Sequence, residues 1–72
     1  MKAIITTTKG FMYAGELRSS SEYFVRVDTN NLPATMMSEL YEMKADITRY
    51  SDHWSVRLDR EYIKTIEFVD NE

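Results

Sequence analysis

Cysteine is absent from this sequence of 72 residues. Without thiols the chain forms neither a disulfide nor a zinc site with thiolate ligands. A domain of this size encloses only a small core and is usually reinforced by disulfides, a metal or oligomerisation. Oligomerisation is therefore the reinforcement that we expect. The length fits one domain, residues 1–72, and the lack of cysteine is typical of a cytoplasmic protein.

Residues from which catalytic and cofactor sites are built are also scarce. His53 is the only histidine, whereas zinc usually takes three or four protein ligands. The sequence contains no phosphate-binding glycine loop and no nucleophile elbow. These absences predict a protein that is not an enzyme and that has no metal or cofactor. His53 is then a surface residue of a polar turn, beside Asp52.

Long apolar runs are missing too, since none approaches the roughly 20 residues that a membrane-spanning helix needs. Nor do we expect a secretory signal, because Met1–Ile5 leads directly into three threonines. Twelve acidic and nine basic residues give a net charge of -3, which opposes binding of duplex DNA through a broad basic face. Single strands remain compatible with this charge because bases stack on aromatic side chains. The sequence has five Tyr, three Phe and one Trp.

Alternating apolar and polar residues predict short strands along most of the chain. One amphipathic helix is expected over Pro33–Lys44, where Met36, Leu40 and Met43 share a face and the proline suits the first turn. The methionines of this helix either dock it onto the strands or form an adaptable partner-binding surface. Many short strands favour a small closed barrel, because closure removes exposed edges. The expected strands are Ala3–Thr8, Phe11–Arg18, Tyr23–Asp28, Ile47–Tyr50, Trp54–Leu58 and Ile63–Phe68.

The two glycines of the chain lie five positions apart. Gly10 suits a turn with positive φ, and Gly15 inside a strand permits the sharp bend of a very small barrel. The pattern Ile5-x-Thr7-x-x-Gly10-x-x-x-x-Gly15-x-Leu17 resembles the first signature motif of the Sm-like family. This family of small barrels includes bacterial Hfq and the LSm proteins.

A counterpart of the family's second motif follows downstream. The stretch Val56-x-Leu58-Asp59-Arg60-x-x-Ile63-x-x-Ile66 has aliphatic residues at the family's four spacings. Both motifs occur in the family's order and together cover most of the expected strands. The resemblance implies an all-β fold, a strongly bent five-stranded Sm-like or SH3-like barrel, with the helix inserted between strands three and four.

The resemblance also indicates where RNA would bind. In RNA-binding members the loop after the second strand carries an aspartate, a base-stacking aromatic or histidine, and a base-reading asparagine. Ser21, Tyr23 and Val25 stand at those positions here, and Asp59-Arg60 replaces an arginine-glycine pair. Tyr23, Arg60, Ser21 and Asp59 are therefore the candidate RNA-binding residues. The alternative is that Tyr23 points inward with the valines of its strand, as part of the core.

Family members form closed rings in which the fourth strand of one subunit pairs with the fifth strand of the next. This implies a homo-oligomeric ring, and the functional hypothesis is a ring that binds single-stranded RNA. The alternative is a protein-interaction or scaffolding ring without nucleic acid, which includes a regulator from a phage or other mobile element. The net charge and the replaced asparagine and arginine favour the alternative, whereas Tyr23 favours RNA. The expected interface residues are Trp54, Val56, Leu58, Ile63, Ile66 and Phe68.

Overall fold

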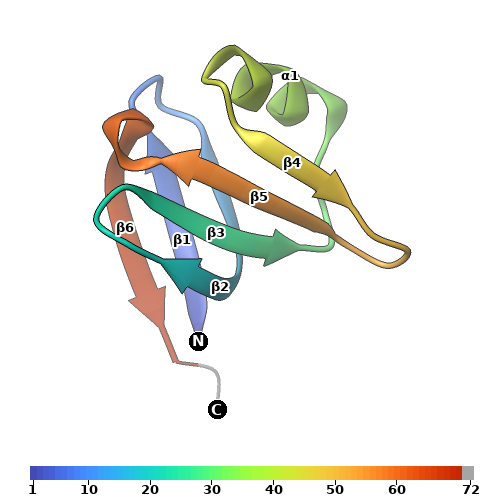
Figure 1. The fold of residues 1–72 in the computed structure, drawn as a ribbon, viewed down its shortest axis with the longest axis horizontal. Helices are drawn as coiled ribbons and strands as arrows, with labels where there is room; N and C mark the ends of the chain where they lie inside the picture. Colours follow the sequence, from blue (N-terminus) through green and yellow to red (C-terminus); the bar gives the residue numbers. More distant parts are fainter. Residues whose placement is uncertain (71–72) are drawn as a thin grey trace.

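Six antiparallel strands and one helix form the part of the chain, residues 1–70, that the computed structural model describes (Figure 1). Their order in the sheet is β4-β5-β3-β2-β1-β6. The helix α1 lies between β3 and β4 in sequence, as expected. The elements are β1 (Lys2–Thr7), β2 (Met12–Ser20), β3 (Phe24–Thr29), α1 (Ala34–Glu42), β4 (Asp46–Arg49), β5 (Trp54–Asp59) and β6 (Ile63–Val69), with a short 3-10 turn (Arg60–Tyr62) before β6.

The sheet differs from the expected barrel in strand number and in closure. It has six strands rather than five, and it is not closed, because β4 and β6 lie at its two ends without pairing with each other. β4 lies where the residue pattern predicts the strand Ile47–Tyr50; it forms a hairpin with β5 and covers the edge of β5 that faces away from β3. In Figure 1, β3 and β5 cross in front of β1, so the sheet is strongly bent.

The core lies inside this bend. The inward side chains of β1, β3 and β5 follow the expected period of two and are fully buried, and Leu40 of α1 joins them. Met43 directly after the helix is buried, and Met36 and Met37 pack against the core. The methionines therefore dock the helix, which is the first of the two interpretations given above. The fully buried strand residues include Ala3, Ile5, Val25, Val27, Val56 and Leu58.

Both glycines lie where a side chain would be strained. Gly10 has a φ of +90° in the turn between β1 and β2, a conformation that L residues rarely adopt. Gly15 lies on β2 where that strand passes close to β3. A Cβ atom at Gly15 would lie 2.0 Å from the carbonyl oxygen of Asp28 and 2.8 Å from a methyl carbon of Val27. The absence of a side chain at Gly15 thus allows the two backbones to approach.

Candidate functional site

The loop between β2 and β3 meets the turn between β5 and β6. The pairing of Phe24 with Asp59 places the start of β3 beside the end of β5. The Arg60 backbone N–H donates a hydrogen bond to the Tyr23 carbonyl oxygen at 2.9 Å, and the Arg60 Nε donates to the Ser21 carbonyl oxygen at 2.6 Å. The structure therefore brings together all four residues that the sequence singled out for RNA binding, although Ser21 and Arg60 lie 39 positions apart.

The Ser21 side chain bonds to the backbone of its own loop and is not directed outward to contact a base. Its hydroxyl oxygen accepts hydrogen bonds from the backbone N–H groups of Tyr23 and Phe24, at 3.0 and 3.3 Å. Its own N–H donates to the Phe24 carbonyl oxygen at 2.9 Å. A serine hydroxyl that bonds to the backbone two or three residues on stabilises a tight turn. Ser21 thus positions Tyr23.

The side chain of Tyr23 is exposed, with 72% of its surface accessible. Strand alternation would place it inward, two positions before the buried Val25, but β3 begins only at Phe24. The turn at Ser21 ends the alternation and rotates Tyr23 outward. The interpretation of Tyr23 as a core residue is therefore wrong. An exposed phenol ring offers an apolar face on which a base or another planar group can stack.

A shallow hollow of about 430 Å³ surrounds Tyr23 and contains charges of both signs. Arg57 and Arg60 supply the positive charge, and three carboxylates, including that of Asp59, supply the negative charge. Sequence reasoning missed Arg57. Its only signal was its outward position inside the second motif, where it is the unspecified residue between Val56 and Leu58. We call Ser21, Tyr23, Arg57, Asp59 and Arg60 the Tyr23 cluster.

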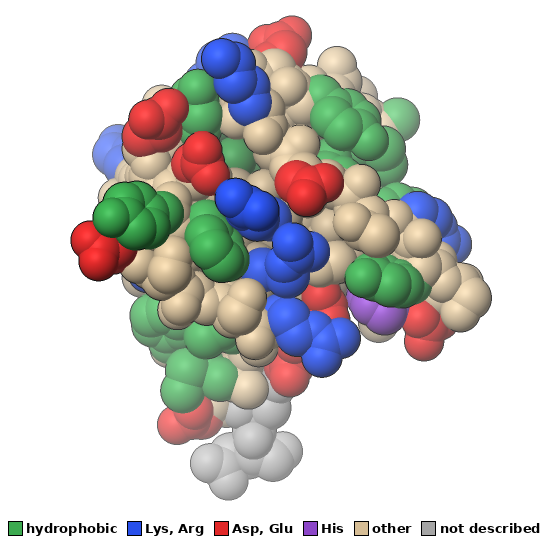
Figure 2. Space-filling model, in the orientation of Figure 1, with side chains coloured by type: hydrophobic (Ala, Val, Ile, Leu, Met, Phe, Trp, Pro, Cys, Tyr) green, Lys and Arg blue, Asp and Glu red, His purple; other side chains and the backbone are tan. Residues whose placement is uncertain are grey.

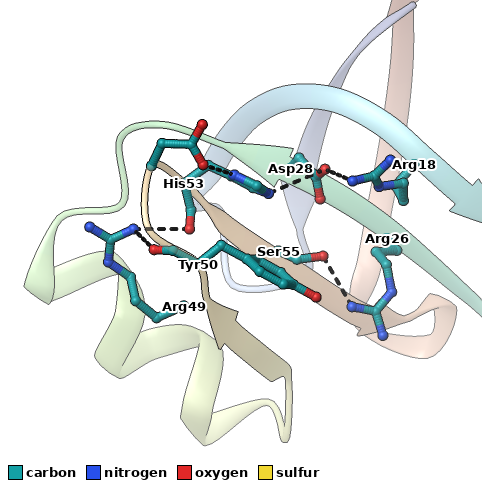
Figure 3. A network of polar contacts seen from close by, with 8 residues as sticks. Arg18, Arg26, Asp28, Arg49, Tyr50, His53 and Ser55 are labelled. Carbon is teal, nitrogen blue, oxygen red and sulfur yellow. Dashed lines mark hydrogen bonds and ion pairs between the residues drawn. The ribbon is translucent and has the colours of Figure 1, made fainter.

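Further polar contacts lie on the outer face of β2, β3 and β5 (Figure 3). Arg26 on β3 lies opposite Arg57 on β5 and donates a hydrogen bond to the Ser55 hydroxyl at 3.0 Å. Arg18 on β2 forms an ion pair of 3.0 Å with Asp28 on β3. Positive side chains thus come from three neighbouring strands of this face.

His53 lies in the turn of the hairpin, as expected, and contacts two carboxylates. Its Nδ1 lies 2.6 Å from the Asp52 carboxylate, and its Nε2 lies 3.6 Å from that of Asp28. The hydrogen bond with His53 lowers the pKa of the Asp52 carboxyl below its ordinary value. The imidazole also stacks on the Tyr50 ring, with centroids 4.9 Å apart. These contacts fix the hairpin turn at the edge of the network.

The predicted interface residues fall into two groups. Val56 and Leu58 are fully buried in the core of the chain, and Trp54 is partly buried under the guanidinium group of Arg49. Their strand, β5, pairs with β3 on one side and β4 on the other, so its backbone is not available to a second subunit. On β6, Phe68 is exposed, whereas Ile63 and Ile66 pack partly against the core. The free strand edges in residues 1–70 are those of β4 and β6.

Within residues 1–70, no three or more acidic or histidine side chains gather as they would around a metal ion. The only α-helix in that range, α1, is too short to cross a membrane. No model of a known protein family, no curated protein and no solved structure matches this chain.

Proposed function

We propose that this protein binds single-stranded RNA at the Tyr23 cluster. One observation carries the proposal, namely that the exposed Tyr23 ring lies beside Arg57 and Arg60 in one hollow. Proteins that bind single strands combine exposed aromatic rings, on which bases stack, with positive side chains that attract phosphates. A base stacked on Tyr23 would leave its phosphates within reach of the two arginines. Such a local arrangement is compatible with a net charge of -3.

The proposal includes a relationship to the Sm-like family, in the form of an open, strongly bent sheet rather than a closed barrel. Two features support this part. The segments that carry the two motifs run through β1, β2, β5 and β6, in one continuous sheet that bends strongly over its core. The loops that follow the second strand and precede the last strand meet at the Tyr23 cluster, which is where the resemblance expects RNA.

A homo-oligomeric ring is the proposed assembly, with β4 and β6 as its contact strands. The outer edges of β4 and β6 have no partner strand within residues 1–70, and unpaired edges are templates for pairing with another chain. A contact between the β6 edge of one subunit and the β4 edge of the next is head-to-tail, and it forms a ring if the rotation per subunit closes. This replaces the pairing of the last two strands that the resemblance implied.

The alternative function is a protein-interaction module that binds no RNA. Its support comes from β6, where Phe68 and Val69 expose 51% and 38% of their surfaces on an edge strand. A partner strand that adds to this edge would gain backbone hydrogen bonds and would cover both side chains. The acidic residues Glu22 and Glu61, which line the hollow beside Tyr23, also fit a partner other than a polyanion.

Titration of labelled oligo-uridine and oligo-adenosine, followed by fluorescence anisotropy at low and moderate salt, separates the two functions. We expect saturable binding that weakens about 5- to 150-fold in Tyr23→Ala, because stacking of one base contributes about 1–3 kcal/mol. Tyr23→Phe should retain most of the affinity, since it keeps the ring. Tyr41→Ala is the matched control, because Tyr41 is exposed on α1. Absence of binding by the wild-type protein at low salt would refute RNA recognition.

A further inference from the structure

Three arginines lie in a row across neighbouring strands of the sheet: Arg57 on β5, Arg26 on β3 and Arg18 on β2. Arg26 and Arg57 are direct partners in the register of β3 and β5. On β2 the register shifts between Leu17 and Ser19, so Arg18 is the extra residue of a bulge. Bulges redirect side chains, and that of Arg18 joins Asp28 on the same face as Arg26. We call these three residues the arginine row.

Positive side chains gather on the face of the molecule to which the row belongs. Figure 2 shows Lys and Arg side chains gathered in the middle of the face on which β3 and β5 lie in front, with hydrophobic side chains on both sides. The acidic side chains on this face lie mostly around this group. The protein thus concentrates positive charge on one part of a surface that is negative in sum.

The opposition of Arg26 and Arg57 is unfavourable within the isolated chain. Like charges directly opposite each other on paired strands destabilise a sheet. Neither arginine forms an ion pair with a carboxylate of residues 1–70. Arg26 bonds to the neutral Ser55, and the Arg57 guanidinium lies 4.6 Å from the centroid of the Phe24 ring.

Two carboxylates that could neutralise Arg57 lie close to it in the sheet. Asp46 is its register partner on β4, and Asp59 is two residues further along β5. The Arg57 guanidinium nevertheless lies over the Phe24 ring, in a cation–π contact, and has no carboxylate partner within residues 1–70. Elsewhere the protein does pair its charges, as between Lys9 and Glu42 at 3.1 Å. Like charges that face each other with no carboxylate of residues 1–70 to neutralise them are a local conflict, and such conflicts are typical of functional sites.

From this arrangement we infer that the arginine row binds a chain of phosphates, namely the phosphodiester backbone of RNA whose base stacks on Tyr23. The inference rests on the proposed function and extends it. Arg57 belongs both to the Tyr23 cluster and to the row, so one strand of RNA contacts the two surfaces without interruption. Neighbouring strands lie about 4.8 Å apart. This spacing sets the guanidinium groups one after another, so that each can donate hydrogen bonds to a different phosphate of the RNA backbone.

The three arginines contribute unequally. A guanidinium group presents five N–H donors in a planar fork that matches phosphate oxygens. Arg57 and Arg26 keep their full charge for such a contact, since no carboxylate of residues 1–70 pairs with them. Asp28 neutralises Arg18 and would repel a phosphate that approached it directly. We therefore assign the phosphate contacts chiefly to Arg26 and Arg57.

The test compares the double variant Arg26→Gln/Arg57→Gln with the wild-type protein on two probes, labelled oligo-uridine and long-chain inorganic polyphosphate. For RNA, the slope of log K against log salt should fall by about 0.7 for each lost phosphate contact, hence by about 1.4 in the double variant. Affinity for polyphosphate should fall in the same variant and stay unchanged in Tyr23→Ala, because polyphosphate has no base to stack. Circular dichroism checks that each variant is folded.

Two controls separate position from charge. Lys44→Gln/Lys64→Gln removes the same total charge from exposed residues outside the row and should leave both salt slopes unchanged. Arg26→Lys/Arg57→Lys keeps the charge but lacks the planar fork, so it should keep the salt slope and lose part of the affinity.

The outcomes distinguish the inference from the proposed function. If Tyr23→Ala weakens RNA binding while Arg26→Gln/Arg57→Gln keeps the wild-type slope on both probes, the arginine row is refuted and the Tyr23 site stands. If the wild-type protein binds polyphosphate through the row but binds no RNA, the row is a site for inorganic phosphate chains and the proposed function fails. If the wild-type protein binds neither probe, both fail.

Discussion

The hydroxyl group of Tyr13 is buried and has no hydrogen-bond partner within residues 1–70. A buried polar group without a partner costs about 1–3 kcal/mol. We therefore expect Tyr13→Phe, which keeps the ring and removes only the hydroxyl, to raise the free energy of unfolding by about 1 kcal/mol. Urea denaturation at neutral pH measures the change. A variant less stable than the wild-type protein would show that the hydroxyl does have a partner.

Burial also makes the effect of Tyr13 depend on pH. It raises the pKa of the Tyr13 phenol well above its ordinary value, because the ionised form would lose its hydration. Above about pH 10 the unfolded chain loses the phenol proton while the folded protein keeps it, so stability falls as pH rises. Tyr13→Phe lacks this loss, and its advantage in unfolding free energy should grow above that pH.

Among the elements, the close approach of β2 to β3 depends on Gly15. A Cβ atom there would lie 2.0 Å from the backbone of Asp28, and backbone atoms of a paired strand do not yield as a flexible side chain would. We expect Gly15→Ala to destabilise the fold by about 3 kcal/mol or more, the upper range for overpacking. Thermal unfolding followed by circular dichroism measures this loss.

Gly10 provides the matched comparison for Gly15. A Cβ atom at Gly10 meets no atom within 4 Å, so only its φ of +90° opposes a side chain. Gly10→Ala should therefore cost about 1–2 kcal/mol, clearly less than Gly15→Ala. Equal losses at the two positions would contradict the close approach of β2 and β3 as the reason for Gly15.

The strands could be predicted from the sequence, whereas the turn at Ser21, the opposition of Arg26 and Arg57 and the open sheet could not. Period-two alternation predicted the strands because each inward residue, such as Val25 or Val56, is in fact buried. Alternation wrongly placed the Tyr23 side chain inward, because alternation alone does not predict the turn that the Ser21 hydroxyl stabilises. Alternation did not identify Arg57 as a candidate site residue. An outward arginine is common on a strand, and Arg57 becomes unusual only because the register of β3 and β5 places it opposite Arg26. Residue spacing also does not determine whether a sheet closes into a barrel, because closure depends on how the strands bend in space. The closed barrel was therefore expected, whereas the sheet is open.

At the scale of the whole molecule, the open sheet leaves two strand edges whose side chains differ in character. The β6 edge carries the exposed Phe68 and Val69, whereas β4 begins with the charged Asp46 and ends with Arg49. A chain of 72 residues without disulfides gains core area when such an apolar edge is covered. Coverage by a second copy also removes the unpaired edge as a site of uncontrolled aggregation.

The assembly is therefore expected to depend on Phe68. We predict that the wild-type protein sediments at micromolar concentration as a species larger than its monomer of 8.5 kDa, and that Phe68→Lys shifts it toward the monomer without unfolding it. A lysine on an edge strand opposes pairing with another strand, and the exposure of Phe68 limits the effect on the core. Met12→Lys is the matched control, because Met12 is at least as exposed as Phe68 but lies on β2, away from the edge strands β4 and β6. A wild-type protein that stays monomeric would refute the ring, whereas RNA binding through Tyr23, Arg26 and Arg57 would still operate, because these residues come from a single chain.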